Sequence, residues 1–429
     1  MKRRVSLFLI ILLPCLFCHA QEEGETYKFI RYSANTLHYD SASPRMTAFF
    51  DRWHRMAETG AGNLNIMQIG GSHVQAGVLS NTVRCRLLGA FPGRVGPRGM
   101  LFPYSAAAKC NNPPDYRIHC VERMELTRCV AKEHAYPLGL CGIAVTASDT
   151  VTEIQVVIPD PCANYATNRI IVFGRSDEGV VPLLRTDGRD IYPSYADPLT
   201  DRFVFNLNST VDSFAVLLPC QPGQHFTLTG LYLDNRRDGL TFSSIGVNGA
   251  AVPDYLRCRH FTRDLRILHP DAVIFGIGIN DASGPNFDTA VFRRNYLQLI
   301  DSIRSVNPDC AFIFVTNNDS FRKTGRRRYS VNTNGALARE VFYRLARDVD
   351  GAVWDQFEIM GGLKSMDLWR KAKLGRPDRV HFTAAGYRLL GNLLADALLQ
   401  AYKDNPVRPA ATQQADTNSP SSPLPPFMP

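Results

Sequence analysis

Four short apolar runs recur along the chain and predict buried parallel strands. They are Leu64–Ile69, Ala272–Ile279, Ala311–Thr316 and Ala352–Trp354. A strand covered on both faces needs such a nearly continuous apolar pattern, although Asn65 and Gln68 interrupt the first run. Amphipathic stretches with helical spacing follow or separate these runs: Val78–Leu88, Phe292–Val306, Ala336–Arg347 and Thr383–Tyr402. Alternating strand and helix signals predict an α/β sheet with helices on both sides.

The middle of the chain has a different pattern. From about residue 110 to residue 240 helical periodicity is weak, and strand-like segments are separated by turn residues: Thr152–Ile158, Arg169–Phe173, Arg202–Phe205, Ser213–Leu218 and Phe226–Leu233. Short strands at this spacing predict a β-sandwich. Because it lies between the first and second α/β strands, we expect an insertion at 110–239 within an α/β domain made of 21–109 and 240–403.

The two ends of the chain are expected to lie outside these domains. Three basic residues at the start precede the apolar run Val5–Phe17, and a small residue, Ala20, stands at a plausible cleavage point. This pattern predicts a secretory signal peptide over residues 1–20 and a secreted or periplasmic protein. That run is too short to span a bilayer comfortably, and no later run is long and apolar enough for a membrane helix. Residues 404–429 are rich in Pro, Ser, Thr and Gln and predict a disordered tail.

The overall charge gives little reason to expect a nucleic-acid partner. The chain of 429 residues has a formal net charge of +8, which falls to +5 without residues 1–20 because they hold three basic residues and no acidic one. That excess is mild for a chain of this size. The densest basic run is 322–328, and two interpretations stay open. It is either a solvated loop or a surface that meets an acidic polymer or lipid headgroups.

Cysteine use is compatible with an oxidising compartment but fixes no pairing. Eleven cysteines, less the two within residues 1–20, leave nine in the expected mature chain. Nine is odd, so at least one thiol stays unpaired within a single chain, and the connectivity is open. None of these nine cysteines forms a Cys-x-x-Cys pair with another, so we expect no structural zinc. The sequence contains no pattern that predicts a cofactor or another metal site.

A serine stands where the first predicted strand turns into a helix. The segment Ile69–Gly77 reads Ile-Gly-Gly-Ser-His-Val-Gln-Ala-Gly, and its two glycines allow a tight turn before Ser72. A serine there lies at the carboxyl edge of the sheet, where α/β proteins place their active sites. Its backbone N–H lies at a helix N-terminus and can stabilise an anion. The alternative is that Ser72 only caps the helix.

An acid and a histidine stand near the other end of the chain. Asp378 and His381 precede the last predicted helix, and their spacing lets both side chains come from one loop. A serine hydroxyl is a poor nucleophile until a base accepts its proton, and histidine suits that role at neutral pH. A carboxylate can orient the imidazole ring and stabilise its cation. The alternative is an ordinary surface loop.

Two further segments could supply hydrogen-bond donors. Asn280 follows the second predicted strand, and its carboxamide could donate to a developing oxyanion. Gly249, in the segment Ile245–Ala250, could offer an unobstructed backbone N–H. Both segments could instead be ordinary turns.

In this order, the four segments resemble the serine, glycine, Gly-x-Asn and Asp-x-x-His blocks of SGNH (GDSL-like) hydrolases. The resemblance covers residues 62–104 and 240–402 and extends to a secreted bacterial esterase subgroup with an inserted β-domain. It implies a flavodoxin-like three-layer α/β/α fold with an inserted β-sandwich, and ester hydrolysis through an acyl-enzyme. By the same resemblance, Ser72 is the nucleophile, His381 the base and Asp378 its orienter. Ser72, Gly249 and Asn280 then form the oxyanion hole.

One position departs from the family pattern. The first block usually has Asp before the serine, where this chain has Gly71. That carboxylate is not a member of the triad, so its absence bears on the geometry of the turn. His73 and Gln75 either line the site or are solvated on the first helical turn.

Several functions remain compatible with these residues. The leading hypothesis is a secreted or periplasmic esterase that removes O-acetyl groups from a glycan, since related peptidoglycan esterases also have an inserted β-sandwich. A lipid esterase or an exported O-acyltransferase would use the same triad. A glycan-binding protein with a decayed site is the non-enzymatic alternative, and the missing Asp is its support. The acyl group and the oligomeric state are left open.

Overall fold

The computed structural model describes residues 26–107, 110–122, 124–159, 165 and 167–406. The expected signal peptide lies outside these residues, as does the expected tail beyond residue 406. No helix within the described ranges is long and apolar enough to cross a membrane.

A six-stranded sheet forms the centre of the larger domain. Its order is β1 (Leu37–His38), β20 (Ala352–Trp354), β17 (Ala311–Val315), β16 (Ala272–Gly276), β2 (Asn63–Gly70) and β15 (Gly239–Gly246). The strands from β20 to β15 are parallel, and β1 pairs antiparallel with β20. All four apolar runs are strands of this sheet, which confirms the predicted α/β class. The strand β15 was not predicted, because polar residues such as Thr241 and Ser243 interrupt its apolar pattern.

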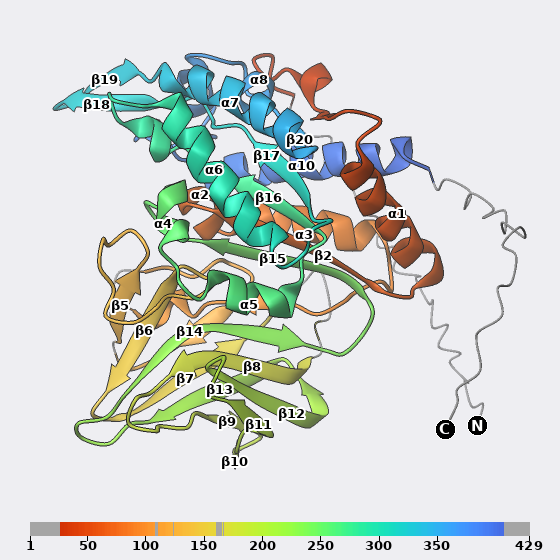
Figure 1. Cartoon of the computed structure of the whole chain (residues 1–429). Coiled ribbons are helices and arrows are strands. Elements are labelled where there is room, and N and C mark those ends of the chain that lie inside the picture. Colours follow the sequence, from red (N-terminus) through yellow and green to blue (C-terminus); the bar gives the residue numbers. More distant parts are fainter. Residues whose placement is uncertain (1–25, 108–109, 123, 160–164, 166, 407–429) are drawn as a thin grey trace, which may run out of the picture.

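Helices cover both faces of this sheet (Figure 1). One face packs against α1 (Pro44–Thr59), α3 (Val78–Ala90) and α10 (Ala384–Asp404), and the other against α5 (Phe261–Leu268), α6 (Thr289–Arg304) and α7 (Asn334–Val349). Successive residues of a strand point to opposite faces, so Ile66 joins the first core and Met67 the second. Burial on both faces explains why the strands are apolar without alternation.

The middle of the chain forms two antiparallel sheets. One contains β10 (Arg189–Ile191), β9 (Leu183–Thr186), β13 (Ser213–Pro219), β7 (Val151–Val157) and β4 (Arg117–His119) in that order. The other contains β11 (Tyr195–Asp197), β12 (Arg202–Val211), β8 (Thr167–Arg175), β14 (His225–Asp234), β6 (Ile143–Ser148) and β5 (Glu125–Arg128). β3 (Gly99–Leu101) pairs with β14, so the chain enters this second sheet before residue 110. We call this antiparallel region the insert.

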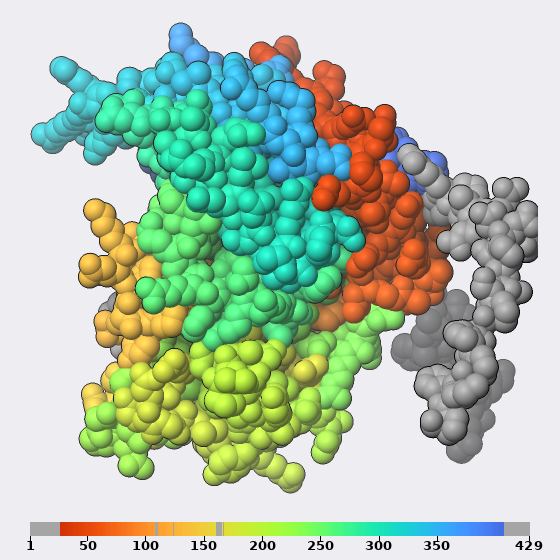
Figure 2. Space-filling model, viewed as in Figure 1, coloured from red at the N-terminus to blue at the C-terminus, as the bar shows by residue number. Residues whose placement is uncertain are grey.

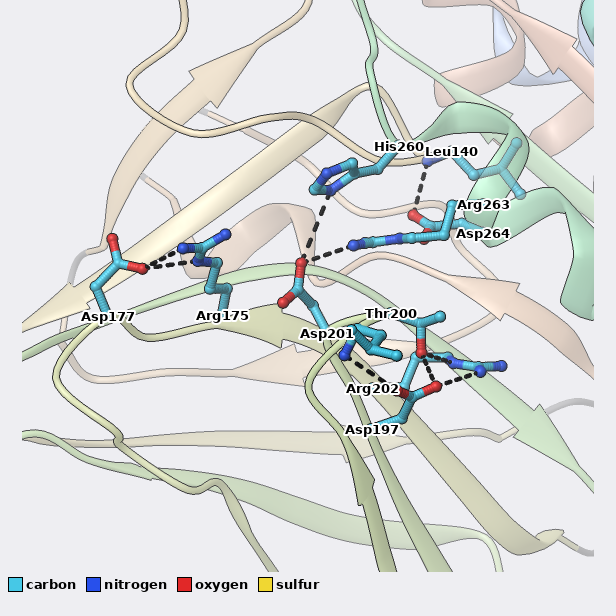
Figure 3. Close-up of polar contacts among 11 residues, drawn as sticks. Leu140, Arg175, Asp177, Asp197, Thr200, Asp201, Arg202, His260, Arg263 and Asp264 are labelled. Atoms are coloured by element: carbon cyan, nitrogen blue, oxygen red, sulfur yellow. Dashed lines mark hydrogen bonds and ion pairs between the residues drawn. The ribbon is translucent and has the colours of Figure 1, made fainter.

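The insert shares its core with the α/β domain. One apolar cluster runs from Phe226 and Leu228 of β14 to buried residues of α5 and α6, such as Leu265 and Tyr296. Polar contacts add to this interface, as Figure 3 shows. There Asp201 of the insert accepts a hydrogen bond of 2.6 Å from Arg263 of α5. The two regions therefore pack as one body.

Seven of the described cysteines are free thiols, and Cys85 on α3 is disulfide-bonded. The free thiols include Cys129, Cys141 and Cys310, which are fully buried. Burial raises the pKa of Cys141 and of Cys310 above the usual thiol range, so both stay protonated and unreactive.

Candidate active site

Ser72 begins the short helix α2 (Ser72–Gln75), directly after β2 and a two-glycine turn. A Cβ on Gly70 would lie 2.1 Å from Cγ2 of Val74 and 2.7 Å from the carbonyl oxygen of Gly276. The turn can therefore form this tightly only with glycine at position 70. Gly71 is the N-cap of α2 and offers no side chain, so the hydroxyl of Ser72 does not cap the helix.

Ser72, His381 and Asp378 form one hydrogen-bonded chain. Ser72 Oγ lies 2.7 Å from His381 Nε2, and His381 Nδ1 lies 2.9 Å from Asp378 Oδ2. The serine and the histidine are 309 positions apart in sequence. The loop before α10 therefore faces the carboxyl edge of β2, and is not an unrelated surface loop.

Asp378 is held in its ionised form. Its Oδ1 accepts hydrogen bonds of 2.9 Å from the backbone N–H groups of Val380 and His381. Partial burial alone would raise the pKa of Asp378. The hydrogen bonds from the His381 ring and from the two N–H groups outweigh burial and hold that pKa well below its usual range. A charged carboxylate on Nδ1 leaves Nε2 as the nitrogen that can accept a proton from Ser72.

Three N–H groups remain candidate donors to an oxyanion. Within the described residues, the backbone N–H groups of Ser72 and Gly249 make no hydrogen bond. Gly249 has a φ of +85°, a left-handed conformation that favours glycine. Asn280 follows β16, and its Nδ2 donates to the carbonyl of Ala250 at 2.9 Å. That bond uses one of the two amide hydrogens and leaves the other for a ligand.

Gly71 lies close to the side-chain amide of Asn280. A Cβ at Gly71 would come within 3.2 Å of Asn280 Nδ2 and 3.3 Å of the Ala250 carbonyl oxygen. Both distances are tighter than ordinary van der Waals contact. The side chain that the family usually has here would therefore press on the Asn280–Ala250 hydrogen bond in this chain.

Comparisons with known proteins found one matching protein family and a set of similar solved structures. A family model described as the GDSL-like Lipase/Acylhydrolase family matches residues 217–389. That stretch includes Gly249, Asn280, Asp378 and His381 and begins beyond Ser72. Over residues 217–389 the chain is therefore similar to the GDSL-like, or SGNH, hydrolases. This similarity to lipases and acylhydrolases supports a serine esterase.

Several solved structures are similar to the chain. A peptidoglycan O-acetylesterase aligns with a TM-score of 0.70 and 21% identity, over 86% of this chain and 99% of that chain. A lipase/acylhydrolase from Enterococcus faecalis has a TM-score of 0.30 and 23% identity, over 40% and 81% of the two chains. A family two carbohydrate esterase from Clostridium thermocellum has a TM-score of 0.28 and 13% identity, over 60% and 94%. No curated protein matches the sequence.

His73 and Gln75 of this chain are held by hydrogen bonds within the protein and are not solvated. The Nδ1 of His73 lies 2.8 Å from the hydroxyl of Tyr387, and its ring centroid is 5.0 Å from that of His381. Burial and then the nearby His381 lower the pKa of His73 to about 3. Gln75 Oε1 accepts a hydrogen bond of 2.7 Å from the N–H of Asn248, beside Gly249. Gln75 thus positions the glycine loop.

Asp281 and Tyr387 also support the site, and neither was predicted from the sequence to do so. The carboxylate of Asp281 accepts from the N–H of Val252, 3.2 Å from each oxygen, and so links the Asn280 loop to the Gly249 loop. Burial raises the pKa of Asp281 to about 7. The role of Asp281 could have been suspected from the sequence, because Asp281 directly follows the candidate donor Asn280. No neighbouring residue in the sequence indicated a role for Tyr387.

The described residues contain no group of three or more His, Cys, Asp or Glu side chains that could hold a metal ion. The polar groups at the site are those of an acyl-transfer centre: a hydroxyl, a base and N–H donors.

Proposed function

We propose that Ser72 attacks the carbonyl carbon of a bound ester while its proton passes to Nε2 of His381. The observation that supports this most is the hydrogen-bonded chain of 2.7 Å and 2.9 Å from Ser72 through His381 to Asp378. The charge that develops on the carbonyl oxygen would be stabilised by the N–H groups of Ser72 and Gly249 and by the amide of Asn280.

Collapse of the tetrahedral intermediate breaks the ester C–O bond. His381 returns its proton to the leaving alcohol, and an acyl group remains on Ser72. Water then attacks the acyl-enzyme, gives its proton to His381, and releases the carboxylic acid as Ser72 recovers its hydrogen. Asp378 stays ionised throughout and stabilises the imidazolium in both steps.

We further propose that the substrate is an O-acetylated glycan outside the cytoplasm. The basic start and apolar run of residues 1–17 support export. The solved structure with the TM-score of 0.70 is that of a peptidoglycan O-acetylesterase, which favours a glycan ester over a lipid ester. The insert supports the same choice, because its segment after β5 approaches the glycine loop: Val130 Cγ1 would lie 3.9 Å from a Cβ on Gly249.

The first test measures hydrolysis of p-nitrophenyl acetate by the wild type, Ser72→Ala and Asn280→Ala. We expect Ser72→Ala to abolish turnover and Asn280→Ala to lower kcat by about 10²–10³ with little change in KM, since its amide acts mainly on the transition state. Full activity in Ser72→Ala contradicts the proposed nucleophile, and an inactive wild type supports a decayed site.

The second test identifies the substrate and the acceptor. Wild type is incubated with O-acetylated peptidoglycan, with and without a sugar acceptor, and free acetate and acetylated acceptor are quantified. We expect acetate as the product in both cases. Acetyl transfer to the sugar indicates a transferase. A triacylglycerol is tested as a second substrate, and its cleavage without any release of acetate from the glycan indicates a lipid esterase.

A further inference from the structure

The hairpin of β18 (Phe321–Gly325) and β19 (Arg328–Val331) stands out from the body of the molecule (Figures 1 and 2). It is a two-stranded sheet that pairs with no other described strand. Its tip includes the basic run found in the sequence, and Lys323, Arg326, Arg327 and Arg328 are all exposed. These charges are not neutralised within the described residues, because no acid there forms an ion pair with Lys323, Arg326 or Arg327.

A groove lies between this hairpin and the loop that contains Asp378 and His381. Its volume is about 360 Å³. Seven residues line it: Lys323, Arg326, Arg327, Tyr329, Arg370, Pro377 and Arg379. Five of them are cationic and none is acidic. One carboxylate that does not line the groove, that of Asp367, lies 3.5 Å from Arg370 and 3.3 Å from Arg379. The groove therefore keeps a strong positive excess.

Arg379 joins the groove to the catalytic loop. It is next to Asp378 in sequence, and its guanidinium carbon lies 5.0 Å and 4.7 Å from the ring centroids of Phe321 and Tyr329. Its carbonyl oxygen accepts a hydrogen bond of 3.1 Å from the N–H of Phe321. Arg379 also has a φ of +60°, which a non-glycine residue adopts only when its surroundings hold it. The groove thus starts one residue from the triad.

We propose that this basic groove binds carboxylate groups of an acidic glycan and so holds the polymer while one of its esters reaches Ser72. The proposal rests on the proposed function, because it takes the glycan to be the substrate. Guanidinium groups pair with carboxylates in two-point geometry, and several spaced cations suit a ligand with repeated charges. The groove is open and exposed, so each pair is weak alone and the binding depends on several together.

Two observations favour a glycan over a membrane surface. None of the exposed large apolar side chains of the described residues lies on the hairpin, so it has nothing to insert below lipid headgroups. In addition, Figure 2 shows the outline of the molecule hollowed between the hairpin and the part of the insert that follows β5. A polymer lying there would contact the groove at one end and the insert at the other.

The test measures binding without turnover, in a Ser72→Ala background. The ligands are polygalacturonate, as a carboxylated polymer, and dextran, as a neutral one, at low salt. We expect polygalacturonate to bind and dextran not to. The double variant Arg326→Gln/Arg327→Asn should weaken that binding at least about tenfold, because it removes two of five groove cations and Asn tolerates the left-handed backbone of position 327. Added salt should weaken the binding as well.

The control is Arg55→Gln/Arg347→Gln, which removes two exposed arginines on α1 and α7. It should bind polygalacturonate as the parent does. Equal affinity in the hairpin variant, or equal loss in the control, would overturn the proposal. Binding to vesicles of anionic lipid without binding to polygalacturonate would also overturn it, in favour of a membrane.

The failure of this proposal can be told from failure of the proposed function. If the protein with Ser72 intact does not hydrolyse p-nitrophenyl acetate but the groove binds the polymer, the esterase mechanism fails and the groove stands. If the ester is hydrolysed and the groove variant binds as the parent does, the mechanism stands and the groove assignment fails.

Discussion

The rings of His73 and His381 are neighbours, yet their surroundings give them different chemistry. The Nδ1 of His73 is hydrogen-bonded to the hydroxyl of Tyr387, and its Nε2 is buried with no hydrogen-bond partner among the described residues. A cation there would lose its hydration, so the lowered pKa of His73 keeps it neutral through the pH range of most enzymes. His381 is about one-third exposed and faces Ser72 on one side and a charged carboxylate on the other. It is therefore the residue suited to be the base.

This difference predicts the shape of the acidic limb of the pH–rate profile. Only a neutral His381 can accept the serine proton, so kcat/KM should fall as pH decreases. Asp378 adds no limb because its lowered pKa keeps it charged, and the pKa of His73 adds none until about pH 3. We therefore expect a single limb with a slope of one on a logarithmic plot, because one histidine has to lose one proton.

The measurement is kcat/KM for a small neutral ester from about pH 8 down to about pH 4, on either side of the ordinary histidine range. A slope of two, or a flat profile between about pH 5 and 8, is incompatible with a single histidine base.

At the level of elements, the turn between β2 and α2 controls the position of the Asn280 side-chain amide, a candidate oxyanion donor. Gly71 leaves room for the amide of Asn280, which lies on the loop after β16. We expect Gly71→Ala to lower kcat roughly tenfold with little loss of stability, because the added methyl displaces that amide by a few tenths of an ångström. The measurement combines steady-state kinetics with thermal unfolding.

Gly89 on α3 provides the matched control. No atom lies within 4 Å of a Cβ built at Gly89, so Gly89→Ala should keep full activity and, as a helical substitution, should not destabilise the protein. Unchanged kcat in Gly71→Ala would mean that the turn tolerates a side chain and that the departure from the family pattern has no effect on the rate.

At the level of the whole molecule, the contact between α5 and the insert is expected to make unfolding a single transition. Arg263 is mostly buried and donates to Asp201 of the insert and to the buried Asp264. Burial raises the pKa of Asp264, so its charge depends on this partner. Arg263→Gln should lower the free energy of unfolding by about 2–3 kcal/mol, as expected when a charged hydrogen bond is lost in a partly buried site.

Denaturant unfolding, followed both by fluorescence and by circular dichroism, measures this change. The control is Arg185→Gln, which breaks exposed pairs with Asp190 and Glu153 on the five-stranded sheet of the insert and should change nothing measurable. Two separate transitions in the wild type would show that the insert and the α/β domain are independent, which is contrary to their shared core.

Local patterns in the sequence were enough to predict much of this protein. A strand buried on both faces needs apolar residues in a row, so four strands of the parallel sheet are recognisable from the sequence alone. Glycines before Ser72, and the close spacing of Asp378 and His381, are also local features. The parallel strand β15 was missed because its buried Thr241 and Ser243 look like loop residues in isolation.

Only the tertiary structure decided which of these local features meet. The contact of Ser72 with His381 spans 309 positions, and the bond of Asn280 to Ala250 depends on how two separate loops pack. The basic run at 322–328 is visible in the sequence, but its union with Arg370 and Arg379 in one groove is not. Periodicity and turn chemistry act over a few residues, whereas side-chain contacts follow from the closing of the whole sheet and its helices.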